Sequence, residues 1–135
     1  MKAFDAEDAQ LDLSAGTPRF YIMRLPAKPT GLSFTQITHH KRVTQCLGSL
    51  TPDAWYMAVA EPSLAAPAPE DVSVFKVPFG FFLKMHTGTW HAGPHFVGHA
   101  HMDFYNLELA DTNQADHHNH HFDAAQGVRI CIEPC

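Results

Sequence analysis

Residues 79–94 carry the sequence FGFFLKMHTGTWHAGP and set the expected fold of this chain. Successive residues of a β-strand point to opposite faces of its sheet, so side chains of one kind recur at every second position. By this period, Phe81, Leu83 and Met85 share one face. The other face carries Phe82, Lys84 and His86. The pattern predicts a buried strand that ends in polar side chains.

A turn and further polar side chains follow this strand. Gly88 marks the turn, and Trp90 and His91 come directly after it. Either His86 or His91 can act as a general base, because an unperturbed imidazole titrates near neutral pH. Lys84 can neutralise the carboxylate of a substrate. The stretch therefore indicates a functional site, and the alternative is a plain strand and turn whose histidines lie at its edge.

The rest of the chain shows short strand patterns that are separated by turn residues. Aromatic and β-branched residues dominate these runs, and no convincing amphipathic helix interrupts them. The Pro/Ala-rich residues 61–71 predict a loop, because proline lacks the amide hydrogen that a helix interior needs. Short strands at near-regular spacing predict an all-β sandwich or barrel. Beside the strand before Gly88, strands are expected at 19–25, 32–38, 54–60, 72–77, 103–109 and 128–132.

In a barrel, the polar residues of the strands could line an interior cavity. The interior of a small barrel can hold one small ligand. Burying polar groups without partners costs several kcal/mol, by a rough transfer estimate. We therefore expect Lys84 and His86 to face inward and to line a pocket.

Length and composition predict one domain. The 135 residues fit the usual range of about 100–200 residues per domain, and 45% of them are hydrophobic. Residues 1–16 are expected to form an acidic N-terminal arm, and residues 17–135 the single β domain. The net charge of −5 and the absence of a basic run argue against a nucleic-acid partner.

The cysteines and the N-terminal residues indicate in which cellular compartment the protein is expected. The three cysteines, Cys46, Cys131 and Cys135, form no CxxC motif, which suggests reduced thiols. Cys131 and Cys135 could chelate a metal weakly, but nothing supports a structural zinc. The N-terminus lacks an apolar signal core, and no apolar stretch is long enough to span a membrane. We therefore expect a cytoplasmic protein.

Two further groups of histidines stand out. His39 and His40 precede Gln45, a layout that can hold a cation or a carboxylate; the alternative is an ordinary polar strand end. If a divalent metal is bound, His40, His86 and His91 are the expected ligands, although histidine and carboxamide need a third strong donor. The tract 116–121, DHHNHH, is interpreted as a solvated loop that binds metals only casually.

In two of these motifs and one strand, the chain resembles the ureidoglycolate lyase family, also called ureidoglycolate hydrolase. The resemblance rests on His40 to Gln45 with Gly48 close behind, and on residues 84–94, which contain Trp-His followed by Pro. The strand that starts at Met102-Asp103-Phe104 supports the resemblance, and its sequence is closest to the plant and cyanobacterial branch of the family. The resemblance covers residues 17–132.

The resemblance implies a fold, a reaction and a set of site residues. The fold is a cupin-like double-stranded β-helix barrel. The reaction cleaves ureidoglycolate to glyoxylate and urea in allantoin and purine degradation, and it requires no cofactor. Members are commonly homodimers. Matched onto this chain, the pocket residues are His40, Gln45, His86, Trp90 and His91.

The expected roles follow from the chemistry of the reaction. His86 or His91 removes the substrate hydroxyl proton and returns it to the leaving urea, and His40 is a further catalytic candidate. Lys84 holds the carboxylate, Gln45 hydrogen-bonds the ureido group, and Trp90 forms a wall of the pocket. Two alternatives remain: a non-catalytic barrel that binds small acids, and a metal-dependent cupin enzyme acting on another small substrate.

Overall fold

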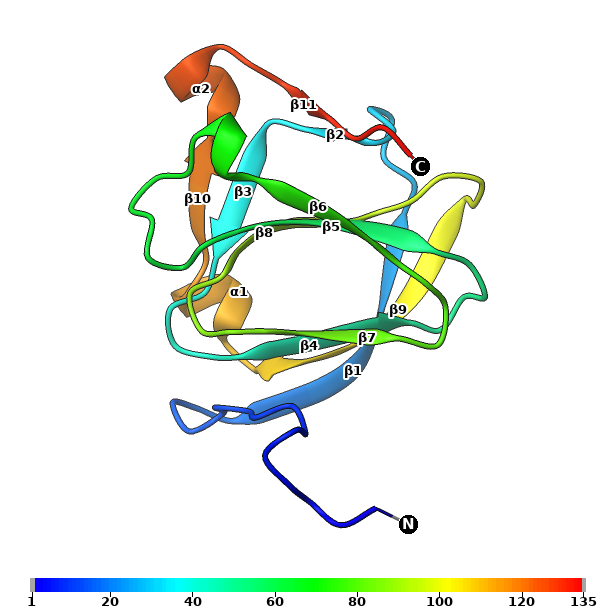
Figure 1. Cartoon of the computed structure of the whole chain (residues 1–135), viewed down its shortest axis with the longest axis vertical. Coiled ribbons are helices and arrows are strands. Elements are labelled where there is room, and N and C mark those ends of the chain that lie inside the picture. The colour runs from blue at the N-terminus through cyan, green and yellow to red at the C-terminus, as the bar shows by residue number, and fades with distance from the viewer. Residues whose placement is uncertain (1, 135) are drawn as a thin grey trace.

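The computed structural model describes residues 2–134, and antiparallel β-strands dominate its regular structure (Figure 1). Two short α-helices and one turn of 3-10 helix (η1, Pro69–Asp71) accompany the strands in this part of the chain. The all-β prediction is confirmed. Met1 and Cys135, which the expected arm and domain include, lie outside the described residues, and so does half of the Cys131/Cys135 pair.

The first sheet has the strand order β1-β9-β4-β7. Its longest ladder joins β1 and β9, in which Pro18 lies opposite Leu109 and Pro26 opposite His101. Burial alternates along these two strands, so one face of the sheet is turned to the interior and the other to solvent. The strands are β1 (Pro18–Pro26), β9 (His101–Leu109), β4 (Gln45–Ser49) and β7 (Phe82–Met85).

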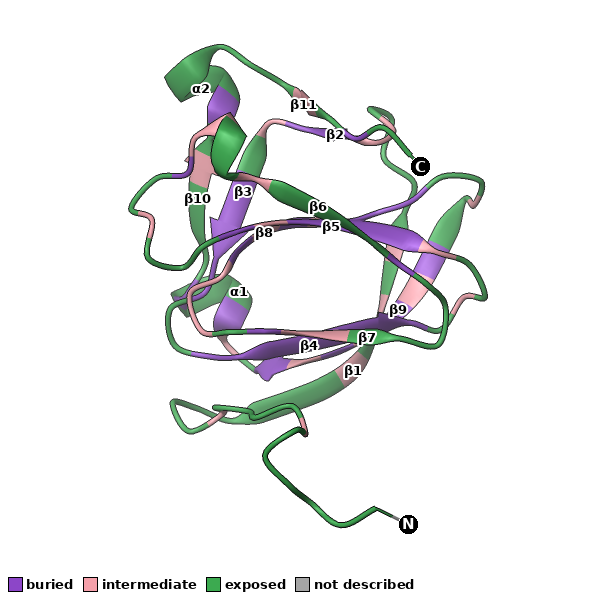
Figure 2. Ribbon diagram, viewed as in Figure 1, coloured by how far each residue is buried: buried purple, intermediate pink, exposed green. Residues whose placement is uncertain are grey.

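The second sheet has the order β10-β3-β8-β5-β6, and a separate pair, β11-β2, lies beside it. Buried residues concentrate in β4, β5, β8 and β9, whereas β1 and β6 are largely exposed (Figure 2). The strands are β10 (His118–His121), β3 (Gln36–His39), β8 (Trp90–His95), β5 (Trp55–Ala60) and β6 (Ser73–Val77), with β11 (Ile130–Cys131) and β2 (Ser33–Phe34) as the pair.

Two apolar clusters hold the sheets in place. One lies around Trp55 and Phe104, which meet edge to face with ring centroids 5.2 Å apart. The other gathers Ile37, Trp90 and Phe122, and it packs the C-terminal segment against the second sheet. Aromatic pairs of this kind add to the stabilisation from buried area.

The histidine tract differs from its expected loop conformation. Four of its residues form β10, which pairs with β3 and brings His118 opposite His39. The edge of β3 offers unpaired backbone groups, and their hydrogen bonding to β10 outweighs the low strand propensity of the tract. Helices α1 (Thr112–Ala115) and α2 (Phe122–Gln126) flank β10.

Residues 2–16 contain no helix or strand. The backbone N–H of Asp12 donates to Thr44 Oγ1 at 2.8 Å, and the N–H of Thr44 donates to the Asp12 carbonyl at 3.1 Å. These bonds attach the arm next to β4. Among residues 2–134, no helix is long and apolar enough to cross a membrane.

Gly93 in β8 has a φ of 134°, and a Cβ there would lie 3.0 Å from the Tyr56 carbonyl oxygen. We expect Gly93→Ala to lower the free energy of unfolding by about 3 kcal/mol, from backbone strain plus this contact. The matched control is Gly98→Ala, because Gly98 also has a positive φ but open space around it. Urea unfolding should show a much smaller loss for the control, and equal losses would contradict the steric argument.

Candidate functional site

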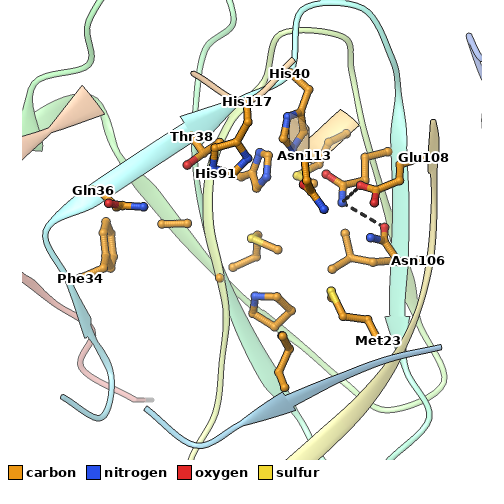
Figure 3. A pocket seen from close by; sticks show the side chains of 18 of the residues that line it. Met23, Phe34, Gln36, Thr38, His40, His91, Asn106, Glu108, Asn113 and His117 are labelled. Carbon is orange, nitrogen blue, oxygen red and sulfur yellow. Dashed lines mark hydrogen bonds between the residues drawn. The ribbon is translucent and has the colours of Figure 1, made fainter. Parts of the chain in front are cut away.

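A cavity of about 270 Å³ lies between the two sheets (Figure 3). Its walls come from β1, β4, β7 and β9 of the first sheet and from β3, β5 and β8 of the second, together with the segment after β9. Polar side chains gather in two places, an imidazole cluster at one end and an acceptor-rich wall on β4 and β9. The cavity therefore combines proton-transfer groups with groups that can orient a ligand.

Three imidazoles meet at one end of the cavity. The ring of His40 lies 5.0 Å from the ring of His91 and 5.6 Å from that of His117, centroid to centroid. His40 Nδ1 is 2.7 Å from the Asp116 carbonyl oxygen, and His91 Nδ1 is 3.2 Å from the Thr89 carbonyl oxygen. A carbonyl only accepts, so each Nδ1 must carry the proton, and each Nε2 is left as a free acceptor.

The protonation state of these rings follows from their burial. Burial and, to a smaller extent, the neighbouring His40 together lower the pKa of His91 from 6.5 to about 4. Burial also lowers the pKa of His40, against the opposing effect of its bond to the Asp116 carbonyl. Both imidazoles are therefore neutral near pH 7 and can accept a proton.

The acceptor wall is built by β4 and β9. Glu108 is 1% exposed, and Tyr21 donates its hydroxyl to Glu108 Oε1 at 2.9 Å. Gln45 Nε2 donates to Asn106 Oδ1 at 3.0 Å and lies 3.4 Å from Glu108 Oε2. Gln45 Oε1 is buried without a partner. An unpaired buried acceptor costs about 1–3 kcal/mol, which a ligand that carries N–H donors would recover.

Lys28 lies on the short connection after β1 and lines the cavity as well. Among the described residues that line the cavity, it is the one lysine or arginine, and burial lowers the pKa of its ammonium group. An anionic group of a ligand would find its counter-charge here.

The structure brings together three of the predicted site residues: His40, Gln45 and His91 all line the cavity. His86 is exposed and borders a narrow crevice of about 10 Å³ that it shares with His40 and His91. It therefore lies beside the imidazole cluster and not in the main cavity.

The expected position of Lys84 is wrong. In the register of β4 and β7, Met85 pairs with Gln45 and Lys84 with Cys46. Gln45 and Met85 face the cavity, so Lys84 lies on the opposite, outer face, where its Nζ is 2.8 Å from His86 Nδ1. From the sequence, the apolar residues of β7 were expected to pack in the core and Lys84 to line a pocket. In the structure, the apolar residue Met85 lines the cavity and Lys84 does not.

Trp90 also does not line the cavity, which corrects its expected role as a pocket wall. It is buried with Ile37 and Phe122 in the cluster of the second sheet. Its ring stacks on His39 at a centroid distance of 3.6 Å, and its Nε1–H donates to the Leu64 carbonyl at 2.9 Å. His91, the next residue in β8, points to the opposite face of the sheet and lines the cavity.

Three residues that line the cavity, Asn106, Glu108 and His117, are not among the site residues predicted from the sequence. Asn106 and Glu108 are spaced two apart in a strand, which was a signal that one face of that strand is polar. His117 carried no such signal, because it was assigned to a solvated loop. Its place beside His40 depends on the pairing of β10 with β3.

The expected metal ligands do not converge. Within residues 2–134, no three His, Cys, Asp or Glu side chains are placed to hold a metal ion together. His86, one member of the expected set, contacts Lys84 instead. Because the Nδ1 atoms of His40 and His91 are hydrogen-bonded to backbone carbonyls, each Nε2 can accept a proton.

Asp116 fixes the imidazole end. Its carboxylate accepts the backbone N–H groups of Lys41 and Arg42, both at 2.9 Å, and it lies 3.2 Å from His118 Nε2. Burial alone would raise the pKa of the Asp116 carboxyl, but these hydrogen bonds outweigh burial and hold the pKa below its usual value. The same residue presents its carbonyl to His40, so it positions the ring and the segment after β9 together.

No protein-family model matches the chain, and no curated protein matches it in sequence.

Replacing Asp116 tests its positioning role. We expect Asp116→Ala to lower the free energy of unfolding by about 1–3 kcal/mol, because two part-buried backbone amides lose their acceptor. The matched control, Asp111→Ala, removes an exposed carboxylate 3.7 Å from Arg42 and should cost less than about 1 kcal/mol. Urea unfolding measures both, and ¹⁵N shifts of His40 report its tautomer. A stability equal to that of the control would contradict the role.

The buried histidines predict an acid-sensitive fold. His91 and His95 both have pKa values lowered to about 4, and neither ring nitrogen of His95 makes a well-aligned hydrogen bond. Below pH 6.5 the unfolded chain binds protons that the folded chain excludes, so stability should fall from pH 6.5 down to about 4.

The variant His95→Phe separates this effect from general acid unfolding. It keeps an aromatic ring against Phe34. The stability lost on acidification should be smaller than in the parent by an amount on the order of 2–3 kcal/mol. Urea unfolding at several pH values measures the difference. The same pH dependence in both proteins would show that His95 is not held neutral by the fold.

Proposed function

We propose that this chain is a ureidoglycolate lyase-like enzyme, and that its two sheets form a cupin-like double-stranded β-helix barrel around the active site. The observation that carries the proposal is the pair of neutral imidazoles, His40 and His91, facing an acceptor-rich wall inside one cavity. The motif resemblance at residues 40–48 and 84–94 supports the same reaction.

The size of the cavity supports a small substrate. Ligand pockets for drug-sized molecules measure about 300–1,000 Å³. The cavity of about 270 Å³ lies just below that range. A small hydroxy acid that carries a ureido group is a better match for it than a nucleotide or a larger cofactor.

His91 is the proposed base. Its Nε2 accepts the proton of the substrate hydroxyl, and the hydroxyl oxygen then forms a double bond to carbon as glyoxylate is made. The carbon–nitrogen bond breaks, its electron pair goes to the nitrogen of urea, and the imidazolium returns the proton there. The proton and electrons balance with no external reagent. His40, in contact with His91, is the second candidate for this transfer.

The wall residues orient the substrate in this proposal. Gln45 Oε1 and the Glu108 carboxylate accept N–H bonds from the ureido group, in agreement with the expected role of Gln45. Lys28 takes over the carboxylate contact that was first expected for Lys84. With the ureido end at Glu108 and the carboxylate end at Lys28, like charges are kept apart.

The same proposal includes the setting of the enzyme. We propose a cytoplasmic homodimer that takes a small-molecule substrate and needs no nucleic-acid, membrane or cofactor partner for the reaction above. Cys46 and Cys131 are free thiols, which supports a reducing compartment.

A non-catalytic barrel that binds small acids is the second candidate. It is favoured by the position of Lys84 and Trp90, two residues of the matched motif that do not line the cavity. Such a protein would bind glyoxylate-like acids in the cavity without releasing urea.

The test is urea and glyoxylate release from racemic ureidoglycolate, with and without chelator. We expect release above the spontaneous rate, insensitive to chelator, and a loss of roughly 10²–10⁴-fold in kcat for His91→Ala. Lys28→Met should raise KM more than it lowers kcat.

The matched control is Lys84→Met, because Lys84 lies on the outer face and should leave turnover unchanged. Binding of glyoxylate without any urea release would favour the binding module. Normal turnover in His91→Ala would overturn the assignment of the base. Turnover that is lost with chelator and restored by a divalent metal would favour the metal-dependent cupin enzyme.

A further inference from the structure

The acceptor wall of the cavity offers a ligand hydrogen-bond acceptors, while its own donor groups are already in use. Tyr21 donates its hydroxyl hydrogen to Glu108 Oε1, and Asn106 Nδ2 donates to the Tyr21 hydroxyl oxygen at 3.1 Å. Gln45 Nε2 faces two acceptors, Asn106 Oδ1 and Glu108 Oε2, which fixes the orientation of this amide and leaves Gln45 Oε1 as its free end. The positions that remain for a ligand are therefore oxygen atoms.

Glu108 brings a negative charge into this wall without a cation of the chain to balance it. The side chain is 1% exposed, and its hydrogen-bond partners, Tyr21 and Gln45, are neutral groups. None of the ion pairs within residues 2–134 includes Glu108. Its carboxylate points into the cavity (Figure 3). A buried carboxylate is costly unless a cation pairs with it, so a cationic ligand would stabilise this wall more than a neutral one.

Donor groups and a positive charge together describe a guanidinium group. A guanidinium carries only N–H donors, in a planar fork that meets a carboxylate through two parallel hydrogen bonds. Gln45 Oε1 can accept a further N–H of the same group. A ureido group has a similar planar shape, but it is neutral, and its carbonyl oxygen is an acceptor for which this wall has no unpaired donor group. Charge-assisted hydrogen bonds are roughly twice as strong as neutral ones, so the wall favours the guanidinium.

The rest of the cavity fits a short carbon chain that ends in an anion. Met23, Leu47 and Met57 contribute apolar wall. Lys28 lines the cavity and is also in contact with solvent, so it lies at the mouth, where a carboxylate keeps part of its hydration. A matching ligand therefore carries its positive charge deep in the cavity and its negative charge near the mouth.

We propose that the cavity selects a small guanidino acid over the corresponding ureido acid, with the guanidinium group on Glu108 and Gln45 and the carboxylate at Lys28. The inference rests on the proposed function for the cavity and its reaction, and it changes the class of substrate.

The same reaction runs on 2-guanidino-2-hydroxyacetate. His91 takes the hydroxyl proton, and the hydroxyl oxygen forms the carbonyl of glyoxylate. The carbon–nitrogen bond breaks, its electron pair goes to the nitrogen, and the imidazolium returns the proton there. The products are glyoxylate and guanidinium, and no other reactant is needed. The positive charge helps the bond to break, because guanidine leaves as a neutral molecule whereas urea must be protonated as it leaves.

Two stable probes that differ in one group test the selection. Guanidinoacetate and ureidoacetate lack the reacting hydroxyl, and the first carries a charged nitrogen where the second carries a carbonyl oxygen. Calorimetric titration near pH 7 should give a Kd for guanidinoacetate that is lower by about tenfold or more. Glu108→Gln keeps the shape of the side chain and should abolish this preference by weakening guanidinoacetate binding alone. Lys28→Met should weaken both probes to a similar extent.

The matched control is Glu70→Gln, which removes the same charge from the surface at η1 and should leave both dissociation constants unchanged. Equal binding of the two probes by the parent, or binding of neither, would overturn the proposal. A preference that survives in folded Glu108→Gln would also overturn it. The comparison of probes on the parent needs no variant, so it decides the question even where Glu108→Gln fails to fold.

Turnover is scored separately from binding. We expect kcat/KM to be higher for 2-guanidino-2-hydroxyacetate than for ureidoglycolate. Urea release from ureidoglycolate by a protein that binds both probes equally would refute the guanidino substrate and leave the lyase reaction standing. Selective binding of guanidinoacetate, with no release of guanidine or urea from the hydroxylated acids, would keep the ligand class and refute the lyase.

Discussion

The register of β4 between β7 and β9 is the constraint on which the rest of this structure depends. It places Leu47 opposite Asn106 and Gln45 opposite Met85, and so decides which side chains meet inside. A slip of one residue would turn every side chain of the strand to the other face. Gln45 would then face solvent, and Cys46 would lie in the cavity beside Asn106 and Glu108. The register of β4 therefore determines which of its side chains line the cavity and which lie on the outer face of the first sheet.

Much of the fold could be predicted from the sequence, and the reasons are local. Alternation before Gly88, the turn at that glycine and the turn residues between the other short runs are sufficient to predict short strands, and the all-β class follows from them. The strand nature of β10 could not be predicted, because four polar residues pair only when an open sheet edge is available beside them. Pairing partners far apart in the chain leave no trace in local sequence.

The candidate site was predictable only in part, for a related reason. His40, Gln45 and His91 were found because their residue types suggest chemistry. Lys84 and Trp90 were misplaced, because period two says which residues share a face but not which face is inside. Glu108 and Lys28 needed the assembled sheets, since their relevance comes from neighbours on other strands.

The imidazole end shows a balance between stability and chemistry. Burial keeps His91 unprotonated and so available as a proton acceptor, and burial of His91 and of His95, which lies outside the cavity, makes the fold sensitive to acid. Gln45 Oε1 adds an unpaired acceptor. Such costs are common where a site must be ready for a ligand. The clusters around Trp55 and Phe122 supply the compensating packing.

The bond from His40 to Asp116 has an evolutionary consequence, because the acceptor is a main-chain carbonyl. Every residue type carries that carbonyl, so no substitution at position 116 can delete it. Mutations can only displace it by loosening the carboxylate anchor to Lys41 and Arg42. The tautomer of His40 is therefore robust to drift in sequence, and losing it would require a change in the path of the backbone.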